Sequence, residues 1–147
     1  MSLIKRIETE LQDARRARDD ARRDALSLIL SALRAAEKDL QRELSDEEEL
    51  QVLQRERKKR IEAEEAFRSA GRESQADAED AELAVLEEFM PSPLSEDELE
   101  EIVDDAIAEV GATSLRDLGR VMKDVMPQVA GRADGGAVSQ LVREKLA

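Results

Sequence analysis

The side chains that most often carry enzyme chemistry are absent from this sequence. It contains no histidine and no cysteine, which removes the commonest general base, thiol nucleophiles and the commonest zinc ligands. Carboxylates are abundant, and pairs such as Asp97 and Glu101 are four residues apart. In so acidic a chain they indicate a solvated helix face, because an acid–base carboxylate needs a desolvated pocket. The sequence therefore predicts no catalytic residue, no metal site and no cofactor.

A glycine-rich segment, Gly-Arg-Ala-Asp-Gly-Gly at residues 131–136, superficially resembles a phosphate-binding loop. No strand pattern precedes it, and it lacks the Gly-Lys-Ser/Thr signature of nucleotide-binding loops. The first interpretation is a tight turn between helices with glycine at positive φ. A second stays open, because N–H groups at the start of the next helix can bind an anion such as an RNA phosphate.

Basic side chains are the remaining candidates for binding chemistry. The net charge is −13, from 36 acidic and 23 basic residues, so the whole chain repels nucleic acid and anionic membranes. Screening confines exposed charges to about 10 Å at ordinary salt, and the local distribution therefore matters. Residues 95–109 hold eight acids and no base, whereas residues 112–147 hold six bases against four acids. A basic face is expected in the latter segment.

Two arginine-rich stretches, residues 15–23 and 55–60, are alternative sites for RNA. Helical spacing disperses each stretch around its axis, and nearby acids such as Asp20 and Glu56 can pair with the bases. Solvated, self-paired surface is the first interpretation and an RNA-contacting patch is the second. No aromatic residue is interleaved for base stacking, which argues against a single-strand platform. We therefore expect RNA contact within residues 112–147.

Hydrophobic periodicity places these candidates on helices, and no strand-like alternation is found. Ser45 with Glu48 and Ser95 with Glu98 have the spacing of capping boxes, and Gly71 and Gly111 are expected helix stops. The predicted helices cover about residues 2–17, 20–44, 45–70, 73–89, 95–110 and 114–129, with a last helix after residue 136. Pro127 is expected to limit the regular part of the sixth.

The Met-Pro-Ser-Pro segment at residues 90–93 is the clearest break, since each proline disfavours helix at the residue before it. We predict an all-α fold with an N-terminal four-helix assembly over residues 1–90 that includes a long helical hairpin. A three-helix domain follows at residues 94–147. Arg57 and Glu64 interrupt the apolar face of the third helix, which is expected to be long, partly exposed and loosely packed at its middle. Without cysteines, a signal-peptide pattern or an apolar run long enough for a membrane, a cytoplasmic location is expected.

Several short motifs together resemble the YqeY family over essentially the whole chain. In the first part they are Gly71-Arg72, Glu82-Leu83, Leu86-Glu87, Met90-Pro91 and Leu94-Ser95-Glu96. In the second part they are Gly111-Ala112, Asp117-Leu118-Gly119-Arg120-Val121-Met122, Met126-Pro127, Gly131-Arg132-Ala133-Asp134-Gly135 and Gln140-Leu141-Val142. The last domain of this family is similar to the tail domain of the B subunit of tRNA-dependent amidotransferase, which helps to recognise tRNA.

The resemblance implies a function connected with tRNA. The first hypothesis is a non-catalytic tRNA-binding or translation-associated protein. The second is an accessory of glutamine-dependent tRNA amidotransfer, a carbon–nitrogen ligase reaction with glutamine as amide donor, with the amidotransferase or aminoacyl-tRNA machinery as partner. The third is a helical scaffold that binds proteins without RNA. The candidate tRNA-binding residues are Arg116, Arg120, Lys123, Arg132, Gly135, Gln140, Arg143 and Lys145.

Overall fold

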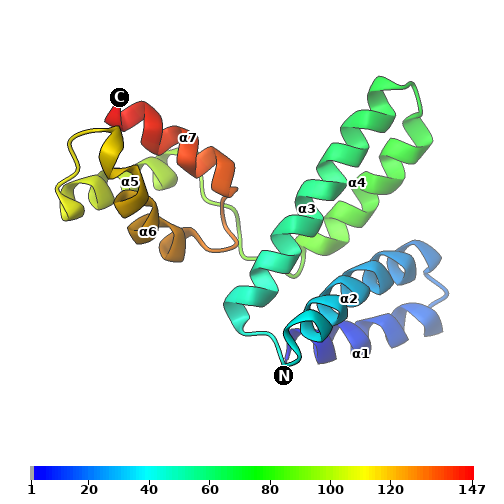
Figure 1. Ribbon diagram of the computed structural model, residues 1–147. Coiled ribbons are helices and arrows are strands. Elements are labelled where there is room, and N and C mark those ends of the chain that lie inside the picture. The colour runs from blue at the N-terminus through cyan, green and yellow to red at the C-terminus, as the bar shows by residue number, and fades with distance from the viewer. Residues whose placement is uncertain (1) are drawn as a thin grey trace. The chain divides into compact units, whose positions relative to one another are not determined.

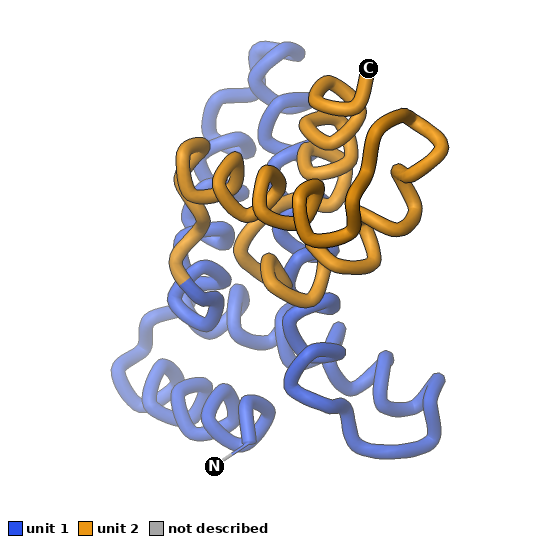
Figure 2. The backbone as a smooth tube through the Cα atoms, turned by 90° about the vertical axis from the view of Figure 1, so that its left-hand side faces the viewer, with its two compact units in different colours: residues 1–91 blue, residues 92–147 orange. Residues whose placement is uncertain are grey.

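A computed structural model describes residues 2–147, and within this range the chain is all-helical without a strand (Figure 1). The all-α prediction is confirmed. The helices are α1 (Leu3–Arg16), α2 (Asp20–Leu40), α3 (Asp46–Ser69), α4 (Glu73–Glu87), α5 (Glu96–Val110), the 3-10 helix η1 (Leu115–Asp117), α6 (Leu118–Val129) and α7 (Gly135–Leu146). They form two compact units, residues 1–91 and 92–147 (Figure 2). No helix in the described part is both long and apolar enough to cross a membrane.

The N-terminal unit packs α1 and α2 as one antiparallel pair and α3 and α4 as another. Asp19 caps α2 by accepting the Arg22 N–H, and the predicted capping box at Ser45 starts α3. The aliphatic core comes mainly from α1 and α2, whereas α3 buries only Val52 and Leu53 near its N-terminal end. The buried core residues are Ile7, Leu11, Ala14, Leu26, Ile29, Leu30, Leu33, Val52, Leu53, Leu86 and Phe89.

The middle of α3 is packed against α4 through ion pairs, which differs from the loose packing expected. Arg60 lies 3.4 Å from Glu79 and 3.1 Å from Glu82 of α4, and its side chain is only 23% exposed. Arg57 pairs with Glu87 of α4 at 3.2 Å. Hydrophobic periodicity cannot predict these ion pairs between α3 and α4, because charged side chains stand at the positions where the apolar face would be.

The C-terminal unit is a three-helix arrangement around a valine-rich core. Ser95 and Glu98 form the predicted capping box of α5, and Gly111 ends this helix in the left-handed conformation with φ of 67°. Ser114 caps η1, which leads directly into α6. The buried residues are Val103, Ala106, Val121, Val125, Val129, Val138, Val142 and Leu146.

Three helix boundaries differ from the sequence-based prediction. Helix α2 ends at Leu40 rather than near residue 44, because Gln41 adopts a left-handed conformation with φ of 56°, and Leu44 packs on the core from the following loop. The segment after Ser114 begins with a 3-10 turn. Helix α6 continues past Pro127 to Val129.

Candidate nucleic-acid interface

Three cationic residues follow one side of η1 and α6. Arg120 and Lys123 are three residues apart on α6, which places them on the same side of this helix, and Arg116 precedes them in η1. The opposite side of α6 carries its fully buried valines. We call Arg116, Arg120 and Lys123 the cation row, and it lies on the solvent side because the valine core fixes the rotation of α6.

The members of the cation row differ in how far carboxylates neutralise them. Arg116 and Lys123 are exposed and make no ion pair within residues 2–147. Arg120 donates a 2.6 Å hydrogen bond from Nη2 to the carbonyl oxygen of Val110 and lies 3.6 Å from Asp117. Its side chain is still 59% exposed. All three positive charges therefore remain accessible to an anion from solvent.

Asp117 fixes the start of the row. Its carboxylate accepts the N–H groups of Thr113 and Ser114 at 2.9 and 3.3 Å. The hydrogen bond from the Thr113 N–H is the largest cause that lowers the pKa of Asp117, and Arg120 adds to it. The ionised carboxylate orients the turn before α6 and thereby the side chains of Arg116 and Arg120.

Arg132 and Lys145, both candidates from the sequence, hold the C-terminal unit together. The Nε of Arg132 donates to the Ser92 carbonyl oxygen at 2.9 Å. The Nζ of Lys145 lies 2.8 Å from both Glu100 and Asp104 of α5, and this side chain is only 22% exposed. Two carboxylates of α5 thus neutralise Lys145, so its charge is less available to an anion from solvent than the charges of Arg116 and Lys123.

The ion pairs of Lys145 predict a pH-dependent stability. The hydrogen bond to Asp104 and then that to Glu100 raise the pKa of Lys145 above its usual 10.5. Because the pKa of Lys145 is higher in the folded state than in the unfolded state, its ion pairs stabilise the unit fully at pH values below the unfolded pKa. This stabilisation is lost as the pH rises through the folded pKa. Lys145→Gln should lower the melting temperature at pH 7 and flatten its decline above pH 10. The exposed Arg143→Gln is the control, and an equal effect of the two substitutions at pH 7 would contradict this role.

Gly135 and Gln140 lie on α7. The N-terminal end of this helix, where an anion could bind next to Gly135, is already occupied by the side chain of Asp134. Asp134 caps α7 and accepts the Ala137 N–H at 3.1 Å. A phosphate at this helix end would meet the Asp134 carboxylate. Gly131 alone in the loop has positive φ, 72°, so the turn interpretation describes the loop. Gln140 is exposed and lies one turn before Arg143 on α7. Arg143 is also exposed and makes no ion pair within residues 2–147.

Most arginines of the two N-terminal stretches are paired with carboxylates. Arg22 contacts Glu10 and Glu88, and Arg23 contacts Asp20 and Asp24. Partners distant in sequence, such as Glu88 directly after α4, were not among those expected. On α3, Arg55 and Lys58 are exposed and without an ion pair in the described range.

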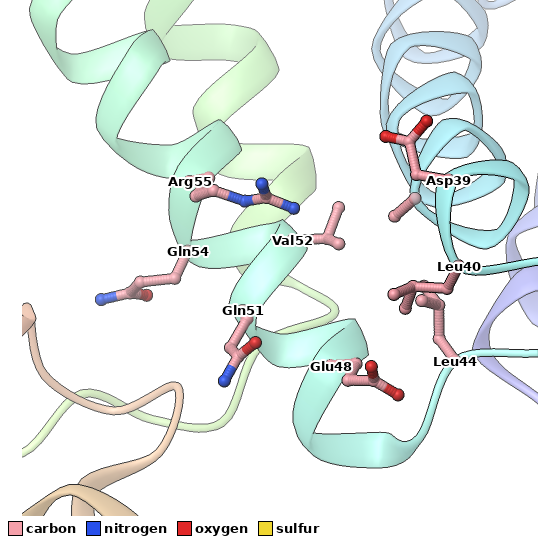
Figure 3. Close-up of a pocket in the computed structure, with 9 residues that line it drawn as sticks. Asp39, Leu40, Leu44, Glu48, Gln51, Val52, Gln54 and Arg55 are labelled. Atoms are coloured by element: carbon pink, nitrogen blue, oxygen red, sulfur yellow. The ribbon is translucent and has the colours of Figure 1, made fainter.

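A groove lies between α2 and α3 in the N-terminal unit. It has a volume of about 540 Å³. Val52 and Arg55 point from α3 toward Leu40 of α2, whereas Gln54 points away (Figure 3). Because Asp39 and Glu48 also line it, the groove has mixed charge and does not match a polyanion.

Comparison with known proteins identifies the family. The family model described as "Yqey-like protein" matches residues 4–146. The chain belongs to the YqeY family. This YqeY chain is also 35% identical over 88 residues to the E subunit of the glutamyl-tRNA(Gln) amidotransferase of Thermococcus gammatolerans. The match covers 57% of the YqeY chain and only 14% of that larger protein.

Proposed function

We propose that this YqeY protein is a non-catalytic, cytoplasmic tRNA-binding protein whose contact surface is the cation row together with Arg143. The observation that carries the proposal is the cation row itself, in which two of three side chains lack any carboxylate partner in residues 2–147. The chain is similar to a subunit of an enzyme named glutamyl-tRNA(Gln) amidotransferase, and this similarity supports tRNA as the ligand.

The arrangement of charges also limits the expected affinity. The net charge of −13 repels RNA, and only the local row offsets this repulsion within the screening distance of about 8–10 Å. We expect dissociation constants of about micromolar or weaker at physiological salt. Such binding suits a protein that contacts tRNA transiently.

The test is a titration of labelled tRNA with the full chain at two salt concentrations. The three contacts of the cation row alone predict a slope of log affinity against log salt of about −2 to −3, and an affinity loss of roughly 15- to 65-fold between about 0.05 and 0.2 M salt. A contact from Arg143 would steepen the slope by about one unit. Binding that does not respond to salt, or no binding at about 0.05 M salt, would contradict the proposal. The second outcome would favour the protein-interaction scaffold.

A second candidate function is an accessory role in glutamine-dependent tRNA amidotransfer. The same similarity to an amidotransferase protein favours it. A purified amidotransferase should then convert misacylated tRNA faster when the chain is added, and the Arg116→Glu/Lys123→Glu variant should not support the increase. An unchanged rate with the wild-type chain would rule out this role.

A further inference from the structure

We infer that the C-terminal unit recognises the paired phosphate backbones of double-helical RNA rather than an extended single strand. The inference rests on the proposed function and specifies which part of an RNA the cation row fits. It follows from the rigidity of the row, from the residue types around it and from the position of the acidic helix α5.

The cation row is a short, rigid line of charge along η1 and α6. Arg116 and Lys123 are seven residues apart, which is about 10 Å along a helix. Val121, Val125 and Val129 are fully buried beneath α6, and the Asp117 hydrogen bonds fix the preceding turn. A double helix presents phosphates in a fixed arrangement, so such a line can contact it without ordering a flexible chain. A single strand must lose conformational entropy to make the same contacts.

Sequence-tolerant binding of single strands usually combines a basic groove with aromatic side chains on which bases stack. Residues 92–147 contain no phenylalanine, tyrosine, tryptophan or histidine, since both phenylalanines are at positions 67 and 89. The exposed side of α7 offers Gln140 and Arg143 instead. Phosphate and sugar contacts, which dominate recognition of double-stranded RNA, are the contacts these side chains can make.

Helix α5 restricts the path of a flexible strand. Glu100 and Asp104 hold Lys145 at 2.8 Å, on the side of α7 that faces α5. A strand that followed the basic residues from Arg143 around α7 to Lys145 would come within screening distance of these carboxylates. A stiff double helix cannot bend around α7 in this way, so it does not follow the surface to the carboxylates that hold Lys145.

Counterion release gives the size of the preference. Each neutralised phosphate contributes about 0.9 to the salt slope on a duplex and about 0.7 on a single strand. For three contacts at about 0.1 M salt, the logarithm of the association constant is then about 0.6 larger for the duplex than for the single strand, which is about fourfold in affinity. The entropy of ordering a single strand adds to this preference.

The experiment is a competition against labelled tRNA with the full chain at about 0.1 M salt. The competitors are an RNA duplex of about 16 base pairs and one of its strands, chosen not to self-pair and supplied at the same phosphate concentration. We expect the duplex to compete at least about fourfold better. The Arg116→Glu/Lys123→Glu variant should lose most of this difference.

Each outcome separates this inference from the function on which it rests. If the single strand competes as well as the duplex while tRNA still binds, the inference is overturned and the tRNA-binding function stands. If tRNA itself does not bind, the proposed function fails and the inference with it. If the variant keeps the full duplex preference, the preference does not come from the cation row, and the inference is overturned.

Discussion

The Arg116→Glu/Lys123→Glu variant should bind tRNA roughly 25- to 60-fold more weakly than the wild-type chain at about 0.1 M salt. Each lost phosphate contact costs about 5- to 8-fold by counterion release at this salt concentration. The salt slope should fall by about two units, and all tRNA sequences should be affected similarly. Both side chains are exposed and unpaired in the described range, so the fold should be retained, as circular dichroism would verify.

The control variant is Arg55→Glu/Lys58→Glu. It also replaces one arginine and one lysine that are exposed and unpaired within residues 2–147, and here both lie on α3. Each pair of substitutions lowers the net charge by 4, so both variants change it from −13 to −17. The general repulsion between the protein and RNA therefore increases equally in the two variants. The control should lose less than about threefold in affinity, because long-range effects are screened. A larger loss for the control than for the Arg116/Lys123 variant would place the RNA on α3 instead.

Leu53→Ala should destabilise the N-terminal unit by about 3 kcal/mol. Leu53 is fully buried, and Val52 and Leu53 are the two residues of α3 in the buried core of this unit. The hydrogen-exchange protection factors of those amides in α1 to α4 that exchange only when the whole unit unfolds should fall roughly 100-fold. Amides of α5 to α7 should be unaffected if the two units fold independently, which remains a prediction.

The matched control for this change is Leu28→Ala, since Leu28 is 45% exposed on α2. It removes the same atoms but should cost less than about 1 kcal/mol, because little apolar surface is lost from the core. Hydrogen exchange followed residue by residue measures both variants. Equal effects of the two substitutions would mean that α3 does not depend on Leu53 for its packing.

The features that could be predicted from the sequence are those with local causes. The capping boxes at Ser45 and Ser95 and the stop at Gly111 depend on residues within one turn, and all three are present in the structure. The aliphatic stripes of α1, α2, α6 and α7 follow from helical spacing. The cation row could likewise be found, because its members are close in sequence.

The features that could not be predicted depend on partners distant in sequence. Lys145 is neutralised by Glu100, 45 residues away, and Arg60 by Glu82, 22 residues away. Glu100 and Asp104 are one turn apart on α5 and hold one base between them, but the sequence alone does not show which base packs there. Without the packing of α5 on α7, nothing in the sequence distinguished Lys145 from Arg143.

The location of the tRNA contact can be tested most directly by nuclear magnetic resonance on the full chain. Unlabelled tRNA would be added in small steps to isotopically labelled protein, and the loss of backbone amide signals followed residue by residue. We predict that signals from residues 114–124 and 139–144 weaken first, while those of residues 15–23 and 55–60 persist. Early loss confined to the two N-terminal stretches, or no loss at any ratio, would contradict it.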